Sequence, residues 1–174
     1  MIDAEREQAS SRVNTPLRVT NALELAAYLD RDFASGRWLA VTQDEIDRFV
    51  ALTGDRNWIH TDVVRAAREL PGAKTIVPGQ LLLALVPGLL QDAYQVTGEE
   101  QGQAAAIRNV RFRRAVHPGD AFRLRARLTL VRQRARFVQV DAVCDLELKS
   151  GQTILTSQRT DIFQTNKAPT LDDD

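Results

Sequence analysis

The stretch TIVPGQLLLALVPGLLQDAYQ, residues 75–95, decides the fold. A Pro-Gly pair at Pro78 and Gly79 precedes a segment that is almost wholly apolar, and a helix that is apolar on every side is normally buried in a protein core. The pattern therefore predicts the end of a strand, a turn, and then a central helix that begins at Gly79. Because proline lacks a backbone N–H, we expect Pro87 to kink this helix or to end its regular part.

Downstream of about residue 104 the hydrophobic period changes to two, which is typical of β-strands. Apolar and polar side chains alternate in AFRLRARLTLV (121–131) and in FVQVDAVCDLEL (137–148), and the segments 107–116 and 153–163 complete about four strands. Each strand has a single apolar face, which predicts an antiparallel sheet covered on one side. The apolar face of the first-named strand consists of Phe122, Leu124, Ala126, Leu128 and Leu130.

Smaller helices are predicted ahead of the central one. In the stretch VTQDEIDRFVALTG, Thr42 and Glu45 form a capping box, and Gly54 marks the end of a helix of about three turns. Asp62 can cap a second short helix. The earlier segment 21–30 also has helical spacing. Its candidate buried residues are Leu23, Ala26, Ala27 and Tyr28.

These patterns combine into an α+β fold class, a curved antiparallel β-sheet wrapped around one apolar helix. A chain of 174 residues suits one compact domain. We place this domain at residues 17–165, between flexible tails at 1–16 and 166–174. The N-terminal tail is polar and mixed in charge, unlike a signal peptide.

The composition argues against several classes of partner. The formal net charge is zero, so the overall charge attracts neither nucleic acid nor anionic lipid. The longest apolar run, residues 81–90, is too short to span a membrane. The single cysteine, Cys144, excludes an internal disulfide and is compatible with a reducing compartment. We therefore expect a cytoplasmic protein with no nucleic-acid or membrane partner.

A carboxylate, a carboxamide and an imidazole lie close together in the stretch TGDRNWIH: Asp55, Asn57 and His60. They follow a predicted helix end and so lie on a loop, where functional groups concentrate. A neutral imidazole is a good base near neutral pH, a carboxylate can share a water molecule with it, and the carboxamide can hold that water. The N–H of Gly79, unpaired at the positive end of the central helix, would polarise a carbonyl oxygen. Glycine would let a ligand approach the backbone closely.

Three motifs in this order resemble one family. TGDRNWIHTD, then TIVPGQLLLAL and later RFRRAVHPGD are similar to the MaoC-like dehydratases, the (R)-specific enoyl-CoA hydratases of hot-dog fold, over about residues 22–165. The opening, with Trp38 and the Val-Thr-Gln that follows it, is most similar to the single-domain branch that includes NodN-like proteins. The resemblance implies reversible syn addition of water to a trans-2-enoyl thioester, which gives an (R)-3-hydroxyacyl thioester.

The resemblance also implies a role for each site residue. Asp55 and His60 would activate the water and manage the proton exchanged at C2. Asn57 would help to fix the water, and the backbone N–H of Gly79 would hold the thioester oxygen. No cofactor is implied beyond the CoA or acyl carrier protein that carries the substrate, and the scattered histidines and cysteine match no zinc spacing. Because a single hot-dog sheet leaves an open edge, we expect a homodimer.

Three residues depart from the family pattern. Trp58 replaces the usual proline of the first motif. Pro78 replaces the usual histidine before the glycine, which stiffens the turn but leaves the glycine N–H in place. Pro87 stands where many members carry a serine, which puts in doubt any polar contact that this serine makes.

Plainer interpretations stand beside these. Asp55 could serve only in an Asx-turn, and His60 could be only a core histidine bonded to backbone. The catalytic hypothesis is favoured because Gly79 and the Pro-Gly-Asp turn follow in the expected order. His117, in that turn, is interpreted as structural or exposed. The alternating arginines of the strands could bind CoA phosphates, although they more often form the solvated face of a sheet.

Two other functions compete with hydration. Hot-dog thioesterases commonly use an acidic residue on or near the central helix, and here no acid occurs between Gly79 and Asp92. A non-catalytic protein that binds acyl thioesters is the second alternative. The retained Asp-Asn-His set argues against it, while Pro78 and Pro87 leave room for it.

Overall fold

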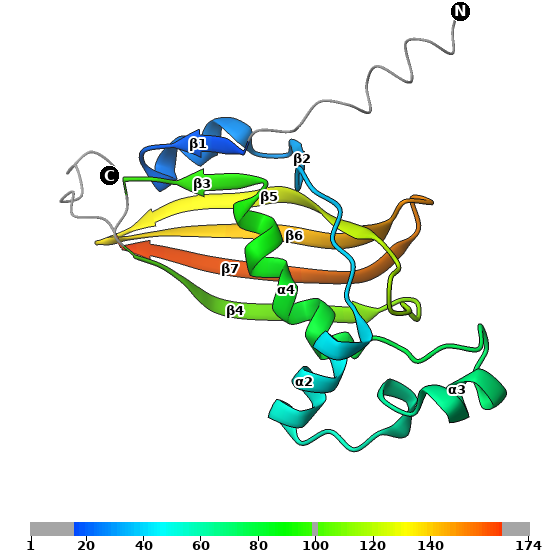
Figure 1. Cartoon of the computed structure of the whole chain (residues 1–174). Helices are drawn as coiled ribbons and strands as arrows, with labels where there is room; N and C mark the ends of the chain where they lie inside the picture. The colour runs from blue at the N-terminus through cyan, green and yellow to red at the C-terminus, as the bar shows by residue number, and fades with distance from the viewer. Residues whose placement is uncertain (1–15, 99–100, 165–174) are drawn as a thin grey trace, which may run out of the picture.

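The structure, a computed structural model, describes residues 16–98 and 101–164. The predicted tails, apart from residue 16, lie outside these ranges. A five-stranded antiparallel sheet in the order β2-β5-β6-β7-β4 curves around one helix, α4, while β1 and β3 pair in parallel beside it (Figure 1). This is the hot-dog architecture, so the predicted fold class is confirmed. The elements are β1 (Leu17–Val19), η1 (Ala22–Tyr28), β2 (Asp32–Ala34), α2 (Gln43–Thr53), η2 (Trp58–His60), α3 (Val63–Glu69), α4 (Gly79–Gln91), β3 (Tyr94–Val96), β4 (Gln101–Phe112), β5 (Phe122–Arg134), β6 (Phe137–Leu148) and β7 (Thr153–Gln164).

α4 packs one apolar face against the sheet, whereas Ala84 and Gly88 on its other side are exposed, so the predicted burial on every side is only partly right. It begins at Gly79, as predicted, with Pro78 as its N-cap, and Pro87 lies within it without ending it before Gln91. No helix in the described ranges is long and apolar enough to cross a bilayer. The buried residues of α4, which share one core cluster with the inward-facing residues of β5, β6 and β7, are Leu82, Val86, Leu89 and Leu90.

The segment before α4 is not the strand end that the sequence predicted. The N–H of Ile76 donates to the carbonyl of Ile59 at 3.0 Å, and the N–H of Val77 donates to that of Val116 at 2.8 Å. These are single bonds to two different segments rather than a ladder to one strand. Their effect is to tie the start of α4 to the loop that carries the polar trio.

The four long strands β4 to β7 confirm the predicted period-two segments. Strict alternation nevertheless puts Leu130 on the wrong face. The register shifts after Leu128, so that Leu130 pairs with Asp141 and Val131 pairs with the buried Val140. This bulge turns Leu130 away from the core face that sequence alternation assigned to it.

Segment 21–30 forms a 3-10 helix, η1, whose buried residues are Ala22 and Leu25. The predicted buried set is right only in part: Leu23 and Tyr28 are half-buried and pack against the core, whereas Ala26 and Ala27 are exposed. A 3-10 helix has three residues per turn, so positions three apart share a face, whereas the prediction assumed the α-helical period. The three-residue strands β1, β2 and β3 were not predicted, since such short segments show no periodicity.

α2 positions the loop that follows it. Thr42 Oγ1 accepts from the N–H of Glu45, and the Glu45 carboxylate accepts from the N–H of Thr42, so the predicted capping box is present. Gly54 ends the helix in the left-handed region, with φ 72°, where glycine has no steric penalty. The chain therefore leaves α2 in a fixed direction directly before Asp55.

We expect Thr42→Ala to lower the free energy of unfolding by about 1 kcal/mol, because it removes the hydroxyl that caps α2. Urea unfolding followed by circular dichroism measures the change. Thr61→Ala alters an exposed threonine outside this cap and serves as the control. A Thr42→Ala protein as stable as the wild type would contradict this account of how α2 begins.

Candidate active site

Asp55 divides its two carboxylate oxygens between a turn and an imidazole. Oδ1 accepts a hydrogen bond from the N–H of Asn57 at 2.9 Å, and Oδ2 lies 3.8 Å from Nε2 of His60. The Asx-turn interpretation is therefore right for one oxygen and leaves the other free to face the histidine. Both features come from the same local geometry, since the turn sets the direction of the second oxygen.

His60 has its tautomer set by its backbone partner. Nδ1 lies 2.6 Å from the carbonyl oxygen of Ile76. A carbonyl only accepts, so Nδ1 carries the proton, and in the neutral ring the lone pair is on Nε2, toward Asp55. The His60 side chain is 11% exposed and that of Asp55 is 39% exposed. The pair thus has one protected base and one carboxylate that solvent can reach.

The separation of 3.8 Å between Nε2 and Oδ2 is too long for a direct hydrogen bond. With a neutral ring, both atoms are acceptors. A small molecule that donates two protons, such as water, matches this arrangement because it can donate to both atoms while its oxygen lone pairs stay free.

Asn57 is the N-cap of η2, with its Oδ1 3.4 Å from the N–H of Ile59. Its carboxamide oxygen is therefore used in the local turn, which leaves its NH2 group as the part that can donate outward. The structure brings Asn57 together with Asp55 and His60 on one short loop, as the sequence predicted. Trp58, in place of the family's proline, lies under the guanidinium of Arg65, whose Cζ is 3.8 Å from the ring centroid.

Gln43 and Thr75, which sequence reasoning missed, hold this loop in place together with His117. Nε2 of Gln43 donates to the carbonyl of His60 at 2.8 Å, and its Oε1 accepts from Oγ1 of Thr75. The Thr75 carbonyl in turn accepts from Nδ1 of His117 at 2.8 Å. No local pattern reveals such a brace, because its members lie 32 and 42 positions apart. His117 thus has the structural role that was one of its two interpretations.

Gly79 is the first residue of α4. The carbonyl of Pro78 accepts from the N–H groups of Leu81 and Leu82, so the N–H groups of Gly79 and Gln80 have no acceptor within the helix. A Cβ at position 79 would lie 2.7 Å from the ring of Phe112. The Phe112 ring therefore leaves no room for a Cβ here unless it moves, which was not the reason for glycine expected from the sequence.

Other reactive groups are placed away from this site. Cys144 is buried, and burial raises the pKa of its thiol to about 12, so it is not a nucleophile near neutral pH. Within residues 16–98 and 101–164, no group of three or more metal-ligating side chains comes together. Of the alternating arginines, Arg123 and Arg125 form ion pairs at 2.8 and 3.6 Å with Glu147, whose side chain is only 8% exposed.

A five-stranded sheet wrapped around one helix, with a carboxylate–imidazole pair on a loop hydrogen-bonded to the segment that leads into that helix, defines a protein of the hot-dog class. A family model described as MaoC like domain matches residues 24–149. This is more than half of the chain, so the chain belongs to the MaoC-like family, and the resemblance seen in the sequence is confirmed.

Individual proteins with similar sequences or structures fall in the same group. 3-Hydroxyacyl-thioester dehydratase Z of Mycobacterium tuberculosis H37Rv is 37% identical over 108 residues, which are 62% of this chain and 70% of that protein. Nodulation protein N of Rhizobium leguminosarum bv. viciae is 29% identical over 108 residues, 62% of this chain and 66% of that protein. The (R)-hydratase from A. caviae involved in PHA biosynthesis has the same fold, with a TM-score of 0.61 and 21% identity over 81% of this chain and 96% of that one.

We expect Gly79→Ala to destabilise the protein by about 1 to 3 kcal/mol, because the added methyl overlaps the Phe112 ring. In a Phe112→Ala background the same change should cost less, and a double-mutant cycle from urea unfolding measures the difference. Gly88→Ala is the control: it lies in the same helix, and its Cβ would meet nothing within 4 Å. Equal costs of Gly79→Ala in both backgrounds would contradict the proposed contact.

Proposed function

We propose that this protein adds water reversibly to trans-2-enoyl thioesters and forms (R)-3-hydroxyacyl thioesters. The observation that carries the proposal is the pair of acceptors formed by Asp55 Oδ2 and His60 Nε2, 3.8 Å apart. Family membership supports the same class of reaction, since the relatives compared with this chain include a 3-hydroxyacyl-thioester dehydratase. No metal or redox cofactor takes part in the proposed reaction.

The proposed step begins with a water molecule that donates to both acceptors. Its oxygen adds to C3 of the enoyl thioester, and one of the two side chains takes its proton. The electron pair of the double bond moves toward the thioester oxygen, which the N–H of Gly79 stabilises. A proton returned to C2 from the same face completes syn addition, so that one water molecule is added across the double bond.

The departures from the family pattern are compatible with this step. Pro78 caps α4 through its carbonyl, and the N–H of Gly79 still begins the helix. Pro87 has no side-chain polar group, so a contact made by a serine at that position is absent from the proposed mechanism. The brace from Gln43 and Thr75 orients the loop independently of both prolines.

The competing functions have weaker support. Asp92, the first acid after the start of α4, forms an ion pair with Nε of Arg37 at 2.6 Å, so it is a poor candidate for a thioesterase base. A protein that only binds thioesters would not require His60 to present a lone pair toward Asp55. We propose that the substrate carrier is CoA or acyl carrier protein, and that the protein acts in the cytoplasm.

We expect Asp55→Asn and His60→Gln each to lower kcat/KM by at least about 100-fold, because each removes a group that transfers protons. The loss of enoyl-thioester absorbance with a trans-2-enoyl-CoA, together with chiral analysis of the product, measures this. Asp62→Asn is the matched control, since it removes a neighbouring charge and retains a side-chain oxygen that can cap α3.

Full turnover by Asp55→Asn and His60→Gln would show that Asp55 and His60 do not carry out the reaction. Release of free thiol in place of hydration would move the assignment to a thioesterase. Retained binding of a saturated acyl-CoA by both variants would show that the loss of turnover is chemical and not a loss of the fold.

We also propose that two copies of this chain form a homodimer along β4. In the described part of the chain, β4 pairs only with β7, at the end of the sheet order. Its outer edge therefore offers unpaired backbone groups, which is a liability in an isolated subunit. Ile107 and Phe112 on this strand are large apolar side chains that are 44% and 50% exposed.

We expect the wild-type protein to elute in size-exclusion chromatography with light scattering at twice the chain mass of 19.4 kDa. Ile107→Glu should shift it toward the monomer, because a charge on the edge strand opposes pairing. Phe137→Glu changes an equally exposed aromatic residue at the start of β6 and should leave the dimer intact. A monomeric wild type at micromolar concentration would refute the proposal.

A further inference from the structure

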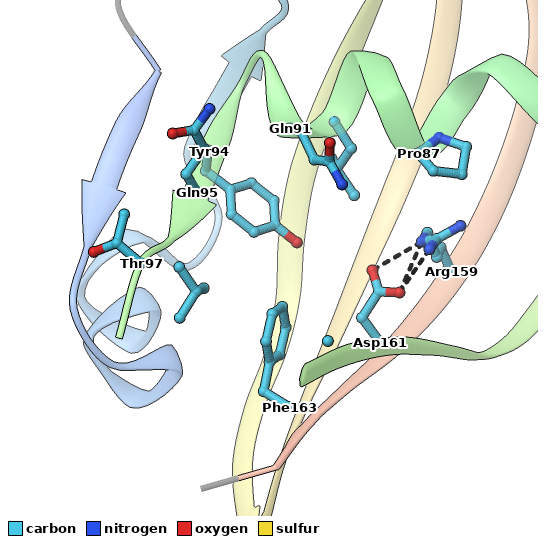
Figure 2. A pocket seen from close by; sticks show the side chains of 11 residues that line it. Pro87, Gln91, Tyr94, Gln95, Thr97, Arg159, Asp161 and Phe163 are labelled. Carbon is cyan, nitrogen blue, oxygen red and sulfur yellow. Dashed lines mark hydrogen bonds and ion pairs between the residues drawn. The ribbon is translucent and has the colours of Figure 1, made fainter. Parts of the chain in front are cut away.

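A cavity of about 350 Å³ lies at the end of α4 that is farthest from Gly79. It is bounded by the last turn of α4, by β3, and by the ends of β4 and β7 (Figure 2). Its volume falls within the range of small-molecule sites. Its apolar wall is formed by Pro87, Leu90, Val96 and Phe163.

A charged pair lies inside this cavity, on the face of the sheet that points toward α4. Nε of Arg159 donates to both carboxylate oxygens of Asp161, at 2.9 and 2.8 Å, and Nη2 lies 2.8 Å from Oδ1. Both side chains are only 10% exposed. Burying an ion pair seldom stabilises a fold more than apolar residues of similar size would. We therefore look for a function of this ion pair other than stabilising the fold.

Tyr94 adds a hydroxyl to the same space. The residue is 5% exposed, its ring packs against Phe33, and Figure 2 shows its hydroxyl pointing across the cavity toward Asp161. Within the described residues, no hydrogen bond joins this hydroxyl to a protein group, and it is not one of the fully buried polar atoms that lack a partner, so it opens onto the cavity. Burial raises the pKa of Tyr94, so the hydroxyl stays protonated at working pH.

The cavity is within reach of an acyl group held at Gly79. Pro87 is eight residues further along α4, which corresponds to about 12 Å of helix. An extended carbon chain advances about 1.25 Å per bond, so roughly ten bonds cover this distance. The β4 positions that share the inner face along this route include Phe112, Ile107 and Ala104, which pair with Leu155, Arg159 and Asp161. Ala104, Ile107 and Phe112 are exposed in the single chain, so a route from Gly79 to the cavity along this edge is part of the proposal.

We propose that this cavity binds the distal end of the acyl group and selects substrates that carry a neutral oxygen function there, a hydroxyl or a carbonyl. The inference rests on the proposed function for the nature of the substrate, but not for the recognition chemistry. Tyr94 and Arg159 would donate to the distal oxygen, and Asp161 would accept from a distal hydroxyl.

The charges in the cavity explain why the oxygen is neutral. Arg159 and Asp161 compensate each other, so the cavity has no net charge to attract a terminal carboxylate, and Asp161 would repel one. A terminal methyl would fit by size but would leave the Tyr94 hydroxyl without a partner. A site built for a hydroxyl discriminates against an analogue that lacks it.

The test compares pairs of acyl-CoAs of about eight to twelve carbons that differ only in a terminal hydroxyl or methyl. Saturated pairs give dissociation constants by calorimetry, and trans-2-enoyl pairs give kcat/KM. We expect the hydroxylated member of a pair to bind about tenfold more tightly, the net size of about one or two hydrogen bonds. Tyr94→Phe should reduce that ratio to about one or two.

Tyr28→Phe is the matched control. It removes the hydroxyl of the other tyrosine, which lies outside the cavity, and should leave the ratio unchanged. Equal binding of both members by the wild type, or a preference that Tyr94→Phe does not alter, would overturn the inference.

The two readouts also separate this inference from the proposed function. Discrimination in binding by the wild type, lost in Tyr94→Phe but without turnover of any enoyl-CoA, would support the cavity and refute the hydratase. Turnover of short enoyl-CoAs without discrimination in either readout would support the hydratase and refute the inference.

Discussion

The hydrogen bond from His60 Nδ1 to the carbonyl of Ile76 is the interaction on which the site depends. It selects the tautomer and holds the plane of the imidazole, so the Nε2 lone pair faces Asp55. The N–H of Ile76 is bound in return by the carbonyl of Ile59, next to the histidine. Because Ile76 is three residues ahead of Gly79, the same short segment fixes both the base and the start of α4. If this segment rotated, both would be misplaced together.

α4 relates two chemically different ends of the molecule. At its N-terminus are N–H groups without an acceptor in the helix, which suit a developing negative charge. At its C-terminus, a compensated ion pair and the Tyr94 hydroxyl suit a neutral polar group. The apolar turns between them belong to the core. The helix therefore sets the spacing between the reacting group and the far end of a bound chain.

Local signals were enough to predict the capping box of α2, the start of α4 and the alternating strands. These local signals failed where the repeat of buried residues departs from the regular helix or strand period. In η1 the three-residue repeat buries Leu25, and in β5 a bulge turns Leu130 outward. The Asp-Asn-His loop was predictable because its members are neighbours in sequence. The hydrogen bonds from Gln43 to Thr75 were not predictable, because these residues are distant in sequence. Arg159 and Asp161 were not predictable either, because in sequence they resemble residues of a solvated strand face and only the path of α4 across the sheet buries them.

The hydrogen bonds of Gln43 restrict which residues can replace it. Its side chain donates to the His60 carbonyl and to Asp47 and accepts from Thr75, so it needs a donor and an acceptor at one fixed reach. A single exchange to glutamate removes the donor, and one to lysine removes the acceptor. This position, outside the reacting pair and in the first turn of a surface helix, is therefore one where ordinary polar replacements are not interchangeable. Substitutions that disturb the site are therefore expected in α2 as well, at residues that would not contact a substrate.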